Sequence, residues 1–190
     1  MKQAPVLSER DVKRVLQHCA QTAFPDRNRV VFQLGYLSGM RIGEIAALKI
    51  SDVLADDGAV RTVIQLTAAQ TKGREARTVR VSTQLQTELA AYLRTLPAER
   101  RAAHLPLITN KLGSAFSANG LCQLMLKLYD AAGLDRATSH STRRTFITTL
   151  AHKGVNVRVL AELAGHKTIS TTQRYIELNE NTLKAAVELV

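Results

Sequence analysis

The sequence predicts a mainly α-helical fold with one small antiparallel β-hairpin. Apolar residues recur at helical spacing through most of the 190 residues, whereas one central stretch is rich in β-branched residues on both sides of Gly73. No internal repeat, low-complexity segment or linker interrupts this pattern. A chain of this length can form one domain, or a small two-lobed unit, with a core of its own.

Signals for helix ends divide the first 50 residues into three helices. The Ser8-Glu9-Arg10-Asp11 sequence is typical of a helix start, and Pro25-Asp26 begins a second helix. Gly39 is suited to end the second helix, because glycine readily adopts the left-handed conformation that often follows a helix. The short third helix carries its apolar residues on one side: Ile42, Ile45, Ala46 and Leu48.

Two short segments, 61–67 and 77–82, are predicted to form the strands of the hairpin. A helical pattern returns at Thr83, and Pro97 and Pro106 bracket a loop after it. The remaining helices are expected at about 117–132, 142–153, 156–164, 171–178 and 181–189.

The charge is the most informative feature of the composition. Lys and Arg outnumber Asp and Glu by 26 to 16, which gives a formal net charge of +10 and a pI of about 10.1. A basic surface can serve solubility alone, but a polyanionic partner, most commonly nucleic acid, is the stronger interpretation. The basic residues are spread along the chain, which favours a folded basic groove.

Several other classes of protein are disfavoured. No apolar run approaches the length of a membrane span, and no stretch near Met1 resembles a signal peptide. Cys19 and Cys122 form no Cys-x-x-Cys pair, so we interpret them as reduced thiols of a cytosolic protein. Neither a His-Glu-x-x-His motif nor a phosphate-binding Gly-x-x-x-x-Gly-Lys loop is present, so the sequence indicates no metal or nucleotide cofactor.

Four basic segments carry the candidate functional residues. In the first, Arg41 follows a glycine turn and Glu44 comes three residues later. This pair can be an ordinary surface ion pair, or an arginine held by a carboxylate and aimed at a phosphate. In the second, Lys72 lies near the tip of the hairpin. Lysine is common in such turns, but an exposed ammonium there could also enter a DNA groove or protonate a leaving alkoxide.

The third and fourth segments supply the remaining candidates. His140 and Arg143 are three residues apart, so on a helix they project from one face. A histidine in that position is as often a capping or core group as a functional one. His166 follows Gly165 in a turn, and Tyr175 comes nine residues later. Alone, Tyr175 would be interpreted as a packed aromatic residue.

Together these side chains match one reaction, the cleavage of a phosphodiester without a metal ion. Arginine and protonated histidine can neutralise the negative charge on the non-bridging oxygens of the transition state. A tyrosine hydroxyl can form a covalent intermediate that conserves the bond for religation. Its ordinary pKa of about 10 means that it needs a base or a positive pocket.

In this order the four segments resemble the motifs of the tyrosine recombinases, the phage integrase family. The family's Thr-Gly-Leu-Arg-x-x-Glu-Leu motif is similar to residues 38–45, and its hairpin lysine to Lys72. Its His-x-x-Arg motif is similar to residues 140–143, and its Leu-Gly-His-x-x-x-x-Thr-Thr-x-x-Tyr motif to the segment that ends at Tyr175. The resemblance covers essentially the whole chain, and it implies the catalytic fold of these DNA breaking and rejoining enzymes.

The resemblance also implies a role for each candidate. Tyr175 would be the nucleophile that gives a 3′-phosphotyrosyl intermediate and a free 5′-hydroxyl. The phosphate would be bound by three groups: Arg41, Arg143 and His166. Lys72 would be the general acid for the 5′-oxygen, His140 the acid or base partner of Tyr175, and Glu44 a buttress. Neither ATP nor a metal is implied.

The same resemblance gives expectations for organisation and partners. Residues 1–190 would be the catalytic domain, with the family's N-terminal DNA-clamping domain absent or trimmed. The partner would be double-stranded DNA, bound by a tetramer on two synapsed duplexes, with a free monomer in the cytoplasm near the nucleoid. The segment 181–190 would pack on its own domain or dock on a neighbouring subunit. The chain departs from the family at Thr142 and Arg144, where a leucine and a histidine are usual.

Two other functions remain open at this point. A type IB-like topoisomerase would use the same chemistry to nick and reseal one strand. A DNA-binding regulator could retain the scaffold without the reaction. The compact hairpin disfavours the first, and the complete set of candidate residues disfavours the second.

Overall fold

The structure, a computed structural model, describes residues 3–71, 73–175 and 187–188. The main elements are, in order, α1 (Glu9–Ala20), α2 (Pro25–Ser38), α3 (Ile42–Ala46), α4 (Ile50–Val53), β1 (Val63–Leu66), β2 (Arg77–Arg80), α5 (Thr83–Thr95), α6 (Ala118–Ala131), α7 (Ser141–His152), α8 (Val157–Ala164) and α9 (Ile169–Gln173). Single 3₁₀ turns at Ala68–Gln70 and Ala98–Arg100 flank β2 and α5. The predicted mainly helical fold with one hairpin is confirmed.

The helix ends that the sequence predicts are present. Ser8 caps α1 through a bond from the Asp11 amide at 3.2 Å, and the Asp11 carboxylate accepts the Ser8 amide at 3.0 Å. Pro25 occupies the first turn of α2, and Gly39 ends this helix with φ of 65°. The four-residue helix α4 was not predicted, because it is too short for an apolar period to be visible.

The hairpin is shorter than the sequence suggests. The strands β1 and β2 pair antiparallel, with Val63 opposite Arg80 and Leu66 opposite Arg77. Before β1, the amide of Arg61 donates to the carbonyl of Val53 at 2.8 Å, so Arg61 pairs with α4, whereas the carbonyl of Thr62 still accepts the Val81 amide at 2.9 Å. The predicted strand boundaries at 61 and 82 were therefore too wide.

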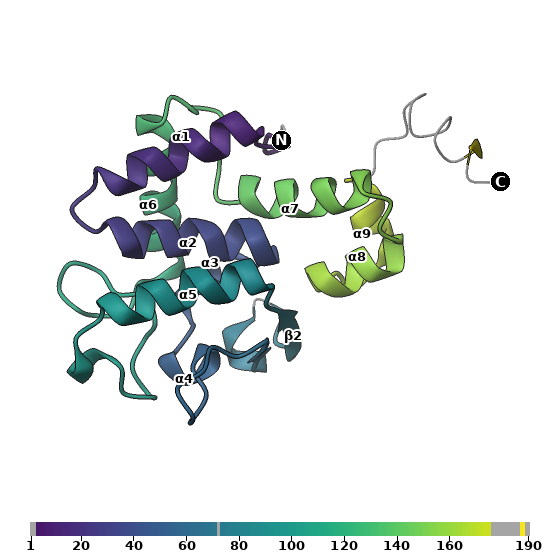
Figure 1. Cartoon of the computed structure of the whole chain (residues 1–190). Coiled ribbons are helices and arrows are strands. Elements are labelled where there is room, and N and C mark those ends of the chain that lie inside the picture. Colours follow the sequence, from purple (N-terminus) through teal and green to yellow (C-terminus); the bar gives the residue numbers. More distant parts are fainter. Residues whose placement is uncertain (1–2, 72, 176–186, 189–190) are drawn as a thin grey trace.

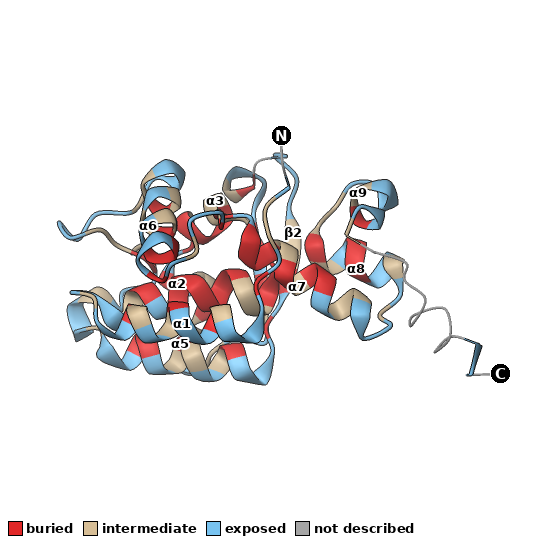
Figure 2. Ribbon diagram, turned by 90° about the horizontal axis from the view of Figure 1, so that it is seen from above, coloured by how far each residue is buried: buried red, intermediate tan, exposed pale blue. Residues whose placement is uncertain are grey.

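Helix α2 lies at the centre of the helical layer and packs against α1, α5 and α7, as Figure 1 shows. Buried residues gather along these contacts (Figure 2). The approach of α7 is close, since a Cβ added at Gly35 would lie 2.5 Å from Oγ1 of Thr142. Thr142, one of the two departures from the family motif, thus lies buried against a glycine where a longer side chain has little room.

Helix α7 leads away from this layer to α8 and α9, which lie at one end of the molecule beside β2 (Figure 1). Helix α9 begins two residues earlier than the predicted helix 171–178 and ends at Gln173, so Tyr175 lies in a turn. Residues 176–178 and most of the predicted helix 181–189 lie outside the described residues. Across the described ranges, no helix is both long and apolar enough to cross a membrane.

Candidate active site

The turn between α8 and α9 is the framework of the candidate site. Gly165 adopts φ of 62° and ends α8, with its amide donating to Glu162 at 3.0 Å and the next amide, of His166, donating to Ala161 at 2.9 Å. These two bonds form a Schellman motif, for which a left-handed glycine is the usual solution. The motif directs the chain sharply away from α8, and His166 is the first residue after the turn.

Three arginines converge on the C-terminal carbonyls of α8. Arg77 donates to the carbonyl of Leu163 at 3.2 Å, Arg143 to that of Ala164 at 2.6 Å, and Arg41 to that of Gly165 at 3.0 Å. The last carbonyls of a helix have no partner within the helix and carry partial negative charge, so guanidinium groups are well suited to this position. Arg143 also donates to the carbonyl of Gly39 at 2.7 Å. One helix end therefore fixes three cations from three different elements.

Glu44 of α3 is the counter-ion of this cluster. Its side chain is 1% exposed and bonds Arg41 at 2.9 Å and Arg77 at 2.7 Å. The Arg41–Glu44 pair was left open as a surface ion pair or a functional pair, and the structure places its carboxylate in the interior. Burial alone would raise the pKa of Glu44, but the hydrogen bonds and charges of Arg77 and Arg41 outweigh it and lower that pKa.

His166 and Tyr175, both half-buried, lie next to each other at this turn. Their rings stack with centroids 5.8 Å apart and planes inclined by 20°. Nδ1 of His166 lies 2.8 Å from the hydroxyl of the fully buried Thr172, which leaves Nε2 for a ligand. The backbone amide of Tyr175 donates to the carbonyl of Thr172 at 2.9 Å. Thr172 therefore fixes both the imidazole and the tyrosine backbone.

Burial and the cationic cluster together decide the charge state of the His166 imidazole. Burial, with the charges of Arg143, Arg41 and Arg77, lowers the pKa of His166 to about 4, so the ring is neutral at neutral pH. Burial, with the charges of Arg41 and Arg77, also lowers the pKa of Arg143 to about 9, and this guanidinium keeps its proton. In the free protein the site thus offers fixed guanidinium groups and a neutral imidazole to an anion.

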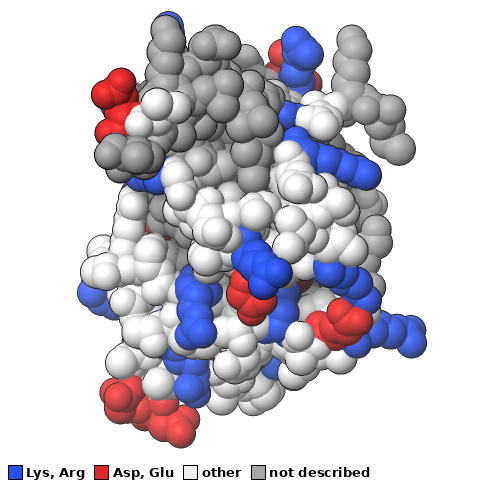
Figure 3. All heavy atoms as spheres, turned by 90° about the vertical axis from the view of Figure 1, so that its right-hand side faces the viewer, with Lys and Arg blue, Asp and Glu red and all other residues white. Residues whose placement is uncertain are grey.

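Arg41, Arg77 and His166 border an open cavity of about 690 Å³, whose lining also includes Lys167 and Glu75, an ion pair at 2.6 Å. Figure 3 shows the end of the molecule that carries α8, α9 and the hairpin, with basic groups spread over the surface. The exposed basic residues among the described residues of these elements and their turns include Arg74, Arg80, Arg158, Lys167 and Arg174. An anionic polymer is the ligand that this combination of cavity and surface fits best.

The other two predicted site residues have different outcomes. His140 immediately precedes α7 and is exposed; among the described residues its imidazole makes no hydrogen bond to the cluster. Its position three residues before Arg143 nevertheless puts it at the same end of α7. Lys72 lies outside the described residues. The sequence pattern did not single out Arg77, although strand alternation places it on the same face as the buried Val79.

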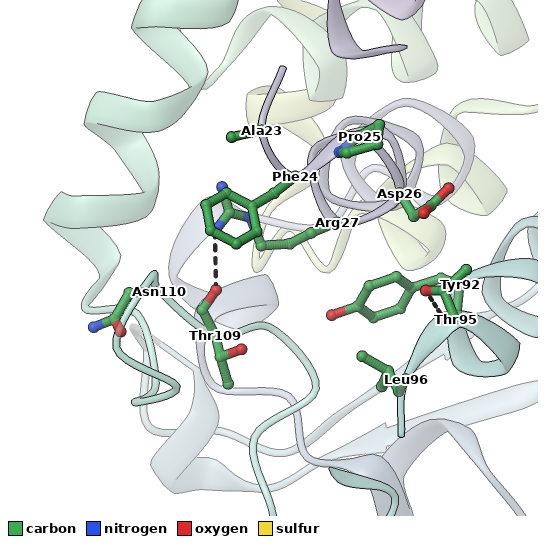
Figure 4. Close-up of a pocket in the computed structure, with 10 residues that line it drawn as sticks. All are labelled: Ala23, Phe24, Pro25, Asp26, Arg27, Tyr92, Thr95, Leu96, Thr109 and Asn110. Atoms are coloured by element: carbon green, nitrogen blue, oxygen red, sulfur yellow. Dashed lines mark hydrogen bonds between the residues drawn. The ribbon is translucent and has the colours of Figure 1, made fainter. Parts of the chain in front are cut away.

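A second, smaller cavity of about 260 Å³ lies between the start of α2 and the end of α5 (Figure 4). Its one arginine, Arg27, lies 4.2 Å from the ring of Phe24 and donates to the carbonyl of Thr109 at 3.2 Å and to Asn28 at 2.8 Å. These contacts already engage the guanidinium, and the nearby Tyr92 hydroxyl donates to Leu107. We therefore assign the candidate site to the α8 turn.

Comparison with known proteins gives one consistent result. The sequence profile described as "Phage integrase family" matches residues 5–182. Tyrosine recombinase XerD of Rickettsia prowazekii is 27% identical over 191 residues, which cover 96% of this chain and 61% of the relative. Tyrosine recombinase XerA of Pyrococcus furiosus is 30% identical over 186 residues, which cover 96% of this chain and 60% of the relative. The chain thus spans about three fifths of these relatives.

Solved structures agree on the fold. The crystal structure of XerA recombinase superimposes with a TM-score of 0.76 at 24% identity, covering 100% of this chain and 66% of that one. The XerH site-specific recombinase bound to its difH substrate superimposes with a TM-score of 0.73 at 23% identity, covering 98% of this chain and 55% of that one. The helical fold with its two-stranded sheet is therefore the fold of these recombinases.

Proposed function

The chain belongs to the phage integrase family, and we propose that it is the catalytic domain of a site-specific DNA recombinase that cleaves and rejoins DNA through a covalent tyrosyl intermediate. One observation carries the proposal. Tyr175 is stacked on His166, which lines the cavity together with Arg41, and Arg41 and Arg143 are both held by carbonyls of the α8 turn. A nucleophile next to a preorganised anion site is the arrangement that phosphoryl transfer needs.

In the proposed reaction, the oxygen of Tyr175 attacks the scissile phosphorus. The phosphorus–O5′ bond breaks, the tyrosine becomes linked to the 3′-phosphate, and the 5′-oxygen leaves as a hydroxyl after gaining a proton. Arg41, Arg143 and Nε2 of His166 bind the non-bridging oxygens, which become more negative in the transition state. A phosphate beside His166 also favours the protonated ring, so the pKa of this imidazole rises when DNA binds.

The remaining roles follow from the family motif. Lys72 gives its proton to the 5′-oxygen, and His140 exchanges a proton with Tyr175. The reverse reaction, in which a 5′-hydroxyl attacks the phosphotyrosyl bond, rejoins the strand. The reaction exchanges one phosphodiester for another and consumes no ATP. The relative bound to its difH substrate supports a DNA substrate, which we take to be double-stranded. Strand exchange between two duplexes would take place in a tetramer, and we place this protein in the cytoplasm near the nucleoid.

The test traps the covalent intermediate. The protein is incubated in EDTA with a library of nicked duplexes. After cleavage beside the nick, the short strand diffuses away, so that the covalent intermediate cannot be rejoined. The protein is then denatured and examined for attached DNA. Tyr175→Phe removes the nucleophilic hydroxyl. Tyr36→Phe is the matched control, because Tyr36 stacks on Phe32 in α2, and the substitution removes a hydroxyl outside the site.

Adduct from the wild type and Tyr36→Phe, and none from Tyr175→Phe, is the expected result. Specific DNA binding without any adduct would leave only a DNA-binding regulator. Relaxation of a supercoiled plasmid by the monomer, with adduct but without recombinant products, would identify a topoisomerase instead. The DNA recovered from the adduct would give the target sequence.

A further inference from the structure

Arg77, the first residue of β2, makes more connections within the site than its place in a hairpin strand suggests. Its Nε and Nη2 atoms donate to the two carboxylate oxygens of Glu44 at 3.0 and 2.7 Å, and its Nη1 donates to the carbonyl of Leu163 at 3.2 Å. Its side chain is 11% exposed, compared with 32% for Arg41. The Arg41 side chain is thus the more accessible to solvent, and the Arg77 side chain is the more deeply buried of the two.

The fork of Arg77 fixes the plane of the Glu44 carboxylate. A bidentate arginine–carboxylate pair constrains both groups far more than a single bond does. Oε1 of Glu44 is shared, since it also accepts Nη1 of Arg41 at 2.9 Å, and Oε2 accepts the Arg41 amide at 2.7 Å. The orientation of the Arg41 guanidinium therefore depends on a carboxylate that Arg77 holds in place.

Arg77 also supports the turn that carries His166. A Cβ added at Gly165 would lie 2.6 Å from Cδ of Arg77, so the side chain runs directly against this residue. The bond to the Leu163 carbonyl ties the same side chain to the last turn of α8. Loss of Arg77 would loosen two anion-binding groups at once: Arg41 through Glu44, and His166 through the turn.

We propose that Arg77 is a positioning residue for the cleavage reaction, which orients Arg41 and the His166 turn without contacting the DNA itself. The proposal rests on the proposed function for the reaction that Arg77 serves. Its structural claim, that Arg77 holds Arg41 through Glu44, stands apart from that function and can be measured without DNA.

Two substitutions in the full chain test the proposal. Arg77→Met keeps an unbranched side chain of similar aliphatic bulk and removes every donor. Arg77→Lys keeps the positive charge but cannot form the bidentate pair with Glu44. This variant tests the proposal if Arg77→Met does not fold. The matched control is Arg29→Met, because Arg29 makes a bidentate pair of the same kind with Glu88, at 2.7 and 2.6 Å, between α2 and α5.

The first readout needs no DNA. In ¹⁵N-labelled protein, a guanidinium held by hydrogen bonds rotates slowly and shows separate Nη resonances. We expect separate Arg41 resonances in the wild type and Arg29→Met, and merged resonances in Arg77→Met. Separate Arg41 resonances in Arg77→Met would overturn the proposal, whether or not the chain cleaves DNA.

The second readout is the single-turnover rate of adduct formation at saturating nicked duplex, together with DNA affinity at several salt concentrations. Misplacement of a phosphate-binding group should lower the rate of Arg77→Met about 10²-fold, with partial recovery in Arg77→Lys. DNA affinity and its salt dependence should stay unchanged, and Arg29→Met should react at the wild-type rate. An unchanged rate of adduct formation in Arg77→Met would overturn the proposal. A salt dependence of DNA affinity that is weaker by about one phosphate contact would also overturn it, because Arg77 would then bind DNA directly.

Failure of the proposed function gives a different pattern. No adduct would then form with any variant, the wild type included, while the Arg41 resonances would still report whether Arg77 holds Arg41.

Discussion

Substitution of Gly165 by alanine should destabilise the protein by more than its backbone conformation alone explains. Gly165 has φ of 62°, and an alanine there would place Cβ 2.6 Å from Cδ of Arg77. The Arg77 side chain is held by bonds to Glu44 and Leu163, so it can move only by giving up those bonds. A left-handed alanine costs about 1–2 kcal/mol and overpacking adds about 1–3 kcal/mol, so we expect a total loss of about 2–5 kcal/mol.

Gly154→Ala is the matched control. Gly154 has φ of 77° at the end of α7, and nothing lies within 4 Å of an added Cβ, so this variant should lose only the backbone part, about 1–2 kcal/mol. Urea unfolding followed by circular dichroism measures both changes. Gly165→Ala should also form adduct more slowly, while Gly154→Ala should not. Equal losses of unfolding free energy in the two variants would refute the contact between Gly165 and Arg77.

Three further predictions concern separate parts of the chain. Histidine NMR of the free chain should give His166 a pKa of about 4, and binding of nicked DNA should raise this pKa. Because the folded pKa lies below the ordinary 6.5, the contribution of His166 to the free energy of unfolding is full above pH 6.5 and is lost as the pH falls toward 4. A pKa near 6.5 in the free chain would contradict this prediction. Thr142→Leu introduces the usual family residue, and it should lower the free energy of unfolding in urea by about 1–3 kcal/mol, because the longer side chain meets Gly35. An unchanged or higher free energy of unfolding would show that there is room for leucine between α2 and α7. Ellman's reagent should label Cys122 before Cys19, because Cys19 is fully buried and burial raises its thiol pKa to about 11; early labelling of Cys19 would contradict the structure.

Local signals in the sequence predicted the helix starts and the hairpin, because capping and turns depend on residues close together in the chain. The serine–aspartate pair at Ser8 and the left-handed Gly39 are such signals, and both are present. Strand lengths were predicted less well, since the start of β1 is decided by a bond from Arg61 to Val53 in another element. The position of Tyr175 in a turn likewise depends on α9 ending early.

The role of Arg77 required the folded chain. Its partners Glu44 and Leu163 lie 33 and 86 residues away, and no local period encodes such contacts. One signal was nevertheless available. Arg77 and Val79 alternate along β2, Val81 continues the alternation just after it, and both valines are buried. A charged side chain on the buried face of a strand requires a buried partner, and Glu44, three residues after Arg41, is the acidic residue that meets the need.

The charge balance of the cluster connects the free structure to the proposed reaction. Arg41, Arg77 and Arg143 with Glu44 give a formal charge of +2, which is distributed over one helix end. A phosphodiester brings one negative charge, and in the proposed reaction the tyrosine oxygen brings a second when it loses its proton, so the negative charge that this cluster stabilises increases as attack begins. In the free protein, burial and then repulsion by the three guanidiniums oppose a positive charge on His166, which is why its pKa is low. The imidazole therefore gains its proton as negative charge arrives, and stabilisation increases toward the transition state.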